Sequence, residues 1–164
     1  MNCADPALVI ATARSWLGTP YHDQASLRGV GCDCLGLARG VWREVVGDEP
    51  FPIPPYSRDW GETGPREVLA EGARAMMPEL APIDASPGAL VLFRMAPRAI
   101  AKHVGILTSQ NRFIHAYERL GVVEERLTLT WARKIAFAFL FPNNAASQGS
   151  GIPSDQANAG PVRK

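Results

Sequence analysis

The chain has 164 residues, of which 46% are hydrophobic and 20% are charged, and its formal net charge is +1. This length favours a single domain with its own hydrophobic core. The small net charge and the lack of a basic stripe with interleaved aromatic residues exclude the usual pattern of a nucleic-acid-binding protein. No apolar run is long enough to span a bilayer, so we expect no membrane partner.

The N-terminal stretch MNCADPALVIATARSW lacks the pattern of a secretory signal peptide. No basic segment precedes its apolar part, and Asp5 and Pro6 interrupt it. We therefore expect the protein to be synthesised in the cytoplasm without a signal peptide. The same two residues predict a helix over residues 6–17, because Asp5 can cap it, Pro6 suits its first position and Gly18 follows its end.

A second helix is predicted from Cys34 to Gly47. Residues 21–31 are polar and rich in glycine, which is typical of a loop, and Asp33 can cap the helix that follows. The apolar residues of this helix recur at helical spacing, so one of its faces should be buried. Residues 51–60 contain three prolines and cannot form a regular element.

The second half of the chain changes from helical patterns to strand patterns. A third helix is predicted from Thr63 to about Met76, and apolar runs bounded by turn residues follow it. The five predicted strands cover residues 89–94, 102–108, 112–117, 122–127 and 135–141. Helices followed by a strand meander predict an α+β fold, with N-terminal helices packed on an antiparallel sheet of about five strands. We place this domain at residues 1–142 and predict a disordered tail over residues 143–164.

Three cysteines are an odd number, and Cys32 and Cys34 stand only two positions apart in the stretch GCDCLGL. A disulfide between them would close a small, strained ring and remove little loop entropy. A zinc site formed with His103 and His115 is a second alternative, but structural zinc sites usually take cysteines separated by two to four residues. We therefore expect no disulfide, no metal and no other cofactor.

Cys34 is the better candidate for a nucleophile, because it falls in the first turn of the predicted second helix. Free amide groups and the positive end of the helix dipole would lower the pKa of its thiol there, and they could hold an oxyanion. The alternative is that Cys34 is a small buried hydrophobic residue, the commonest role of a free cysteine. Cys32 lies in the preceding loop, and we expect it to pack beside the site or to pair with Cys34 only under oxidation.

A nucleophilic cysteine needs a base, and the chain has three histidines. His22 lies in the predicted loop, where a structural role is the simpler interpretation. His103 and His115 lie on adjacent predicted strands. If residues 109–111 form a three-residue loop, these two histidines lie on one face of the sheet, one diagonal step apart. A loop that is one residue longer or shorter would send them to opposite faces.

Four motifs together resemble the NlpC/P60 family of cell-wall peptidases, which have a papain-like core. The stretch GCDCLGL resembles the D-C-S-G nucleophile motif of the family, and LGTPY resembles its L-G-x-P-Y motif. SPGALVLFR resembles the P-G-D-L-V-x-F strand, and KHVGILTSQNRFIHAYE resembles the hairpin that runs from H-V-G-I-Y to F-I-H-A. The matches occur in family order over roughly residues 6–141, and together they are specific.

The resemblance implies a hydrolase that cleaves stem peptides of the bacterial cell wall, at the bond between γ-D-glutamate and the diamino acid. Carried over by position, Cys34 is the nucleophile, His103 is the base, and His115 is the polar residue that orients His103. Tyr21 and Asp33 are implied to bind the substrate. The expected partner is therefore a peptidoglycan stem peptide.

Two departures from the family motifs affect the site. Leu35 stands where the family has a serine beside the nucleophile, and Ala89 replaces the acidic residue of the strand motif. The stretch TPYHDQASLRGVGCDC most resembles family members encoded in phage tail modules and in gene transfer agents. That likeness implies tail-tip proteins as partners, and delivery to the periplasm or cell wall on a phage-like tail.

Two other functions stay open on the sequence. An N-acetylmuramoyl-L-alanine amidase or an acyl transferase on the same core would use the same cysteine and histidine, and its products would distinguish it. A tail-assembly protein with a degenerate site is the other hypothesis. Leu35 favours this hypothesis, whereas the presence of Cys34, His103 and His115 opposes it.

Overall fold

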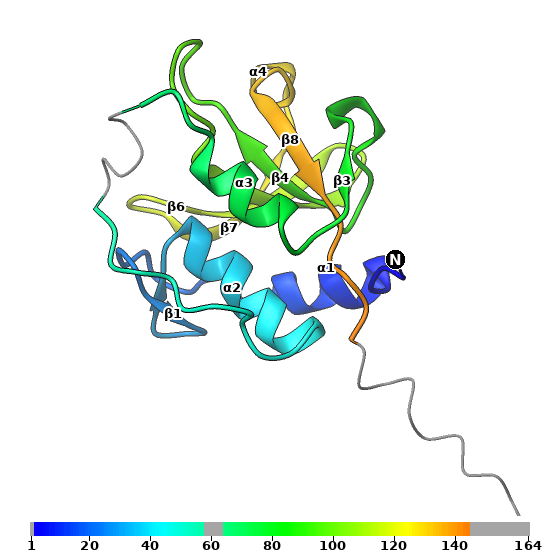
Figure 1. Ribbon diagram of the computed structural model, residues 1–164. Helices are drawn as coiled ribbons and strands as arrows, with labels where there is room; N and C mark the ends of the chain where they lie inside the picture. Colours follow the sequence, from blue (N-terminus) through cyan, green and yellow to red (C-terminus); the bar gives the residue numbers. More distant parts are fainter. Residues whose placement is uncertain (1, 58–63, 145–164) are drawn as a thin grey trace, which may run out of the picture.

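The computed structural model describes residues 2–57 and 64–144, and Figure 1 shows its helices and its antiparallel sheet. The elements in chain order are α1 (Pro6–Ser15), β1 (Ser26–Leu27), β2 (Gly31–Cys32), α2 (Cys34–Val45), α3 (Val68–Arg74), β3 (Glu79–Leu80), a 3₁₀ turn (Pro82–Asp84), β4 (Leu90–Phe93), β5 (His103–Ser109), β6 (Arg112–Tyr117), β7 (Gly121–Arg126), α4 (Leu129–Ala132) and β8 (Ile135–Phe139). No helix in the described ranges is long and apolar enough to cross a membrane. The predicted tail from residue 145 onward lies outside the described residues.

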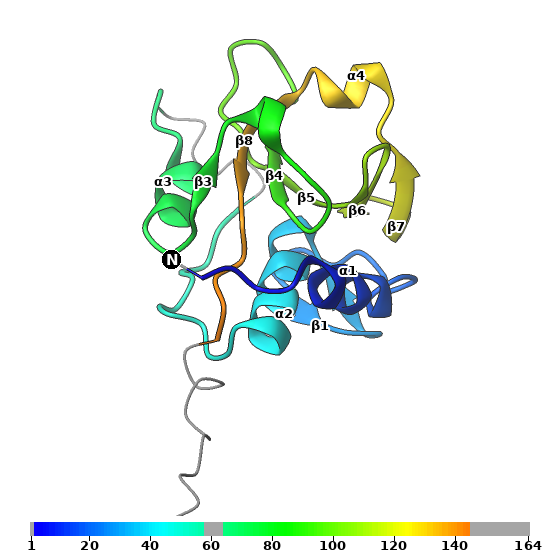
Figure 2. The same ribbon diagram turned by 90° about the vertical axis from the view of Figure 1, so that its right-hand side faces the viewer.

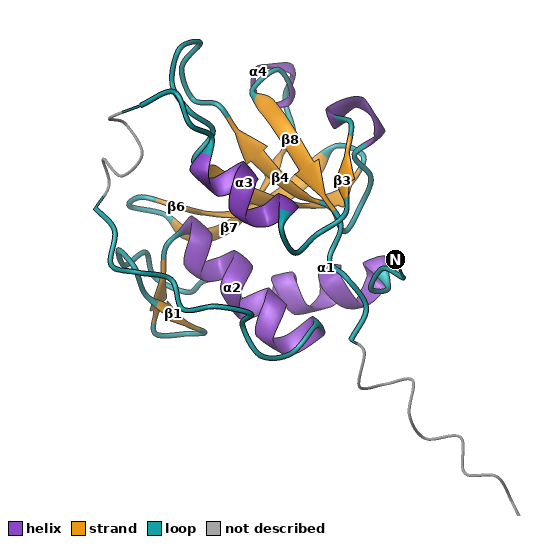
Figure 3. Ribbon diagram, viewed as in Figure 1, coloured by secondary structure: helices purple, strands orange, loops and turns teal. Residues whose placement is uncertain are grey.

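Six strands form one antiparallel sheet in the order β3-β8-β4-β5-β6-β7, and β1 and β2 form a separate pair. Strands β4 to β7 follow a meander, but the prediction of a meander was wrong for the last strand. As Figure 3 shows, the chain turns back through α4, and β8 lies between β3 and β4. In this position β8 pairs on both edges, and its residues Ala138 and Phe139 become fully buried.

Helices α1 and α2 pack together against one face of the sheet (Figure 2). Gly40 allows their close approach, because a Cβ at this position would lie 2.0 Å from the Trp16 ring. The indole N–H of Trp16 donates to Glu44 across the same contact, at 3.1 Å. The core between these helices and the sheet includes Val9, Ala13, Leu37, Val41, Leu92, Val104, Ile106 and Ile114. This packing fixes α2, which carries the candidate nucleophile, relative to the strands.

Most of the longer elements are confirmed within a few residues. The second helix begins at Cys34 after the Asp33 cap, and β6 covers the predicted residues 112–117. The third helix is shorter than predicted and begins at Val68. Strands β1, β2 and β3, the 3₁₀ turn and α4 were not predicted, because each is too short to show a clear periodic pattern in the sequence.

The hairpin of β5 and β6 has the register that brings the two histidines to one face of the sheet. A shorter turn and a β-bulge produce this register in place of the expected three-residue loop. Ser109 pairs with Arg112 across a two-residue turn, which is one residue shorter than expected. A β-bulge at Thr108 adds the missing residue, so that Ile106 pairs with Ile114. A three-residue loop would have given the same pair, and the bulge therefore restores the predicted register.

Candidate active site

A cleft of about 500 Å³ lies at the N-terminus of α2, beside the start of β5 and the turn between β6 and β7. The residues that line it are Tyr21, Asp23, Gln24, Asp33, Cys34, Leu35, Tyr56, Ser57, Met95, Lys102, His103, Ala116, Tyr117, Glu118 and Arg119. The structure therefore brings four of the five predicted site residues to one place. The fifth, His115, is fully buried and reaches the cleft through its contact with His103.

Cys34 is the first residue of α2, and its sulfur lies against the beginning of β5. The thiol donates to the carbonyl oxygen of Lys102, with a distance of 3.8 Å from Sγ to O. Backbone N–H groups of Leu35 and Val104 also interact with the sulfur and favour its charged form. Because Lys102 directly precedes His103 in the chain, these contacts place Cys34 beside the residue predicted to be its base.

The pKa of the Cys34 thiol is raised to about 12, so the expectation of a lowered value was wrong. Burial is the largest cause, because it disfavours the charged thiolate, and the negative charge of Asp33 adds to it. The amides at the helix start act in the predicted direction, but burial outweighs them. The thiol is therefore neutral near pH 7 in the free protein.

His103 and His115 form a hydrogen-bonded pair, with 2.8 Å between Nε2 of His103 and Nδ1 of His115. The other ring nitrogen of His115, Nε2, lies 2.7 Å from Oε2 of Glu125 on β7. These contacts join side chains from three adjacent strands into one chain. The contact between the two imidazoles is the one that the predicted role of His115 requires.

Burial keeps both imidazoles neutral near pH 7. It lowers the pKa of His103 to about 3, and the positive charges of protonated His115 and of Lys134 add to the effect. Burial also lowers the pKa of His115, although the carboxylate of Glu125 opposes it. The Trp131 ring contacts both imidazoles, with centroid distances of 5.9 Å to His103 and 5.3 Å to His115. The site therefore holds a neutral thiol and neutral imidazoles at rest.

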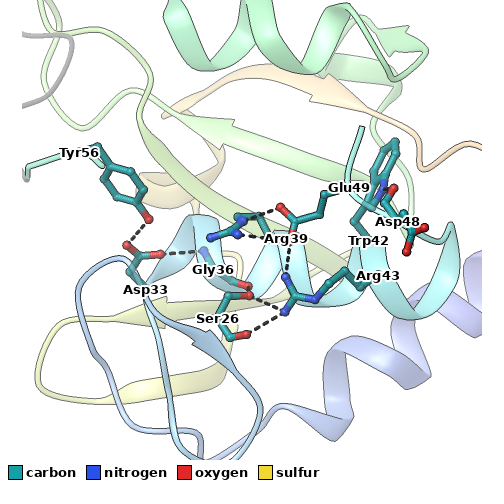
Figure 4. A network of polar contacts seen from close by, with 9 residues as sticks. All are labelled: Ser26, Asp33, Gly36, Arg39, Trp42, Arg43, Asp48, Glu49 and Tyr56. Carbon is teal, nitrogen blue, oxygen red and sulfur yellow. Dashed lines mark hydrogen bonds and ion pairs between the residues drawn. The ribbon is translucent and has the colours of Figure 1, made fainter. Parts of the chain in front are cut away.

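Asp33 holds three segments together beside Cys34, as Figure 4 shows for two of its partners. Its Oδ1 accepts from the backbone N–H of Gly36 at 2.7 Å, which caps α2. Its Oδ2 accepts from the hydroxyl of Tyr56 at 2.5 Å and from the backbone N–H of Gln24 at 2.8 Å. Gln24 has a left-handed backbone, with φ 61°, and its side-chain oxygen accepts from the Tyr56 N–H. Asp33 thus positions the site, and its expected contact with substrate stays a prediction.

Ion pairs fasten the segment that carries Tyr56 to α2 (Figure 4). Glu49 accepts from Arg39 at 2.8 Å and from Arg43 at 2.5 Å, and Arg43 also donates to the carbonyl and hydroxyl oxygens of Ser26. Burial alone would raise the pKa of Glu49, but the two guanidinium groups hold it below its usual value. The segment after α2 is therefore tied to the helix through Glu49, and Arg43 links the same helix to β1.

Leu35, which stands where the family resemblance expects a serine, lines two hollows of the molecule. One is the cleft, and the other is an apolar cavity of about 320 Å³ between α2, α3 and the segment after α2. Tyr56 lines both as well. A leucine suits a wall that is shared with an apolar cavity, where a serine hydroxyl would lack a partner.

Cys32 does not line the cleft. It lies in β2, pairs with Ser26 on β1 and is fully buried in the core, which agrees with the expected packing role. In the described part of the chain, none of the three cysteines forms a disulfide bond. Within residues 2–57 and 64–144, no group of three or more histidine, cysteine, aspartate or glutamate side chains could hold a metal ion.

Three residues of the site were missed by the sequence analysis: Glu125, Tyr56 and Gln24. Glu125 lies within a predicted strand, but only the register of β6 and β7, in which Phe113 pairs with Glu125, shows that its side chain reaches His115. Tyr56 follows a proline-rich stretch with no regular pattern. Nothing in the sequence indicated its contact with Asp33.

Comparison with models of known protein families matches residues 18–139 to the NlpC/P60 family. The matched range contains Cys34, His103 and His115. Among curated proteins, the Gamma-DL-glutamyl hydrolase of Bacillus subtilis (strain 168) is 29% identical over 117 residues, which are 69% of this chain. The chain spans only 24% of the length of that relative.

Solved structures of similar fold include the NlpC/p60 domain of the peptidoglycan hydrolase SagA, with a TM-score of 0.56 and 22% identity. The similarity covers 82% of this chain and 97% of that domain. Another is an NLP/P60 family protein, described as similar to lipoprotein, from Staphylococcus aureus subsp. aureus Mu50. Its TM-score is 0.58 and its identity 20%, and the similarity covers 88% of this chain and 44% of that protein. At these identities the likeness concerns the fold.

Proposed function

Because the chain belongs to the NlpC/P60 family, we propose that it is a cysteine endopeptidase that cleaves stem peptides of bacterial peptidoglycan. The observation that carries the proposal is one cleft lined by Cys34, at the start of α2, and by His103, which is hydrogen-bonded to buried His115. A nucleophile, a base and a group that orients the base are the parts that acyl transfer through a covalent intermediate requires.

In the proposed reaction, the Cys34 sulfur attacks the scissile carbonyl carbon. Since thiol and imidazole are neutral at rest, the thiol proton moves to His103 as the sulfur–carbon bond forms and the carbonyl electron pair moves to oxygen. The Cys34 N–H at the helix start and a neighbouring donor stabilise the oxyanion. His103 then protonates the leaving amine as the carbon–nitrogen bond breaks, and afterwards activates the water that hydrolyses the thioester.

The proposed scissile bond joins the γ-carboxyl group of D-glutamate to the diamino acid. The name of the Bacillus subtilis relative, a Gamma-DL-glutamyl hydrolase, supports a γ-glutamyl bond. The cleft carries charged side chains of both signs: Asp23 and Glu118, and Lys102 and Arg119. A stem peptide presents free carboxylates and an amino group on either side of this bond, so its charges can be matched within the cleft.

The test is digestion of purified Gram-negative peptidoglycan by the wild type, by Cys34→Ala and by Cys32→Ala as the matched control, with fragments identified by mass spectrometry. We expect stem peptides cut after D-glutamate from the wild type and from Cys32→Ala, and none from Cys34→Ala. Sugar-free stems that keep their first L-alanine would indicate an amidase instead. No release under reducing conditions, beside an active hydrolase as control, would contradict the proposal and favour a degenerate tail-assembly protein.

An acyl transferase is the second candidate, and one observation favours it. The apolar cavity that shares Leu35 and Tyr56 with the cleft could hold an apolar acyl group whose carbonyl lies at Cys34. Such an enzyme would pass the acyl group to an amine or alcohol instead of water. Detection of a transfer product, rather than a new D-glutamyl carboxylate, would decide for it.

A role on a phage-like tail is also part of the proposal, with action in the periplasm or cell wall and tail-tip proteins as partners. Its support is the likeness of residues 19–34 to family members encoded in phage tail modules and gene transfer agents. Mass spectrometry of purified tail particles tests it directly. Presence of the chain in the particles would support this role, and its absence from intact particles would contradict it.

A further inference from the structure

The two short contacts of His115 determine where the protons of the histidine pair lie. An ionised carboxylate only accepts hydrogen bonds, so Nε2 of His115 carries the proton in its 2.7 Å contact with Glu125. A neutral imidazole has a single N–H, and Nδ1 of His115 is therefore an acceptor. Nε2 of His103, 2.8 Å away, must donate to it. In neutral His103 this leaves Nδ1 without a proton.

We propose that Glu125 is a positioning residue: by accepting from His115, it keeps Nδ1 of His103 free to take the proton of Cys34. The inference rests on the proposed function, because it assigns a role in the same reaction. Glu125 does not line the cleft and acts through His115.

The opposite proton arrangement shows why an obligate acceptor matters at this place. If Nδ1 of His115 carried the proton, it would donate to Nε2 of His103, and the single proton of His103 would then sit on Nδ1. That nitrogen could not accept a proton from the thiol. Without a carboxylate, both arrangements satisfy the contact between the two imidazoles, and nothing selects the productive one.

The place of Glu125 on β7 suits this role. Glu125 pairs with Phe113 and Val123 pairs with His115, so Glu125 and His115 lie on the same face of the sheet, one diagonal step apart. The Glu125 side chain is 38% exposed, whereas His115 is fully buried. The preceding residue Glu124 lies on the other face and is engaged by Arg14 and by the hydroxyl of Thr108. Two adjacent glutamates thus have separate partners.

The negative charge of Glu125 also favours the charged form of the base. When His103 accepts the thiol proton on Nδ1, it becomes an imidazolium whose Nε2–H still donates to His115. His115 in turn donates to Glu125, which stabilises the positive charge through the intervening ring. No proton moves to Glu125 in this step, and the proton of His103 leaves with the amine.

The first test reads the protons directly by nitrogen NMR of protein labelled with ¹⁵N-histidine, which contains three histidines. We expect His103 and His115 of the wild type to carry their protons on Nε2. In Glu125→Gln, whose amide can either accept or donate, we expect a mixture of both forms for each ring. Glu124→Gln is the matched control and should keep the wild-type spectrum. Protons on Nδ1 in the wild type, or an unchanged spectrum in Glu125→Gln, would overturn the inference.

The second test measures alkylation of Cys34 by iodoacetamide in a Cys3→Ser background, with the modified peptide identified by mass. This readout requires no peptidoglycan, so its failure and the failure of the proposed function are distinguishable. We expect Glu125→Gln to slow alkylation about tenfold, because the base is in the wrong form for part of the time and its charged form loses the stabilising carboxylate. On a substrate, kcat should fall by a similar factor with KM unchanged. An alkylation rate equal to that of Glu124→Gln would refute the positioning role.

Discussion

Cys34 and His103 lie in the same cleft, but different kinds of contact hold them there. On the helix side, Asp33 caps α2 and bonds to two nearby loops, so Cys34 is positioned mostly by residues close to it in the sequence. On the strand side, His103, His115 and Glu125 come from three strands, and only the pairing of those strands aligns them. The position of the proposed nucleophile therefore depends on local capping, whereas that of the proposed base depends on strand register.

The largest expected effect is on the strand side, from the loss of the base itself. His103→Ala should lower kcat/KM by about 10²- to 10⁴-fold, the usual contribution of a side chain that transfers a proton in the transition state. His22→Ala is the matched control, since His22 is exposed and does not line the cleft. Steady-state kinetics on a stem peptide decide this. An equal fall of kcat/KM in both variants, or no fall in His103→Ala, would contradict the role of His103 as the base.

The next effect is on the helix side, where Gly36 packs against the loop that Asp33 holds. A Cβ at Gly36 would lie 1.9 Å from the carbonyl oxygen of Ala25, so Gly36→Ala should lower the free energy of unfolding by about 1–3 kcal/mol or more. Gly72→Ala in α3 is the control, since its Cβ would meet nothing within 4 Å. That variant should gain about 0.5–1 kcal/mol. Urea denaturation of both variants measures the difference, and a stable Gly36→Ala would show that the loop is not fixed.

Burial of the histidines on the strand side predicts that stability depends on pH between pH 7 and pH 5. In the unfolded chain His103 and His115 bind protons below about pH 6.5, but in the folded protein the pKa of each is lowered, to about 3 for His103. The unfolded state therefore binds more protons in this window, and the free energy of unfolding should fall as the pH drops from 6.5. The slope is at most about 1.4 kcal/mol per pH unit for each histidine.

Urea unfolding at pH 7 and pH 5 measures this slope above the range in which Glu49 and Glu124 lose their own stabilising charge. His103→Gln should show a shallower slope than the wild type. An unchanged slope in His103→Gln would mean that this histidine is protonated when folded.

The smallest effect concerns substrate binding at the mouth of the cleft. Arg119 lines the cleft, and within the described part of the chain its guanidinium forms no hydrogen bond or ion pair. If it pairs with a substrate carboxylate, Arg119→Gln should raise KM about two- to fivefold and leave kcat unchanged. Arg133→Gln, outside the cleft, is the control. A fall in kcat with constant KM would place Arg119 in the chemistry instead.

The same contrast explains how much could be predicted from the sequence. Asp33 as a cap, Cys34 at the helix start and the ranges of β4 to β7 follow from local patterns, and the structure confirms them. The prediction that both histidines share one face of the sheet depended on a three-residue loop between β5 and β6. The bulge at Thr108 gives the same strand register with a shorter turn, and no local sequence pattern indicates this bulge. The place of β8, the contact of Glu125 and the raised pKa of Cys34 depend on tertiary packing, which the sequence does not display.

The proposed reaction requires a covalent intermediate on Cys34, formed with His103 as the base. Mass spectrometry of the enzyme quenched in acid during turnover of a γ-D-glutamyl peptide tests it most directly. We expect a mass increase equal to the acyl part of the substrate, located on the peptide that contains Cys34 and absent from Cys34→Ala. Product formation with no adduct, together with turnover by Cys34→Ala, would contradict it.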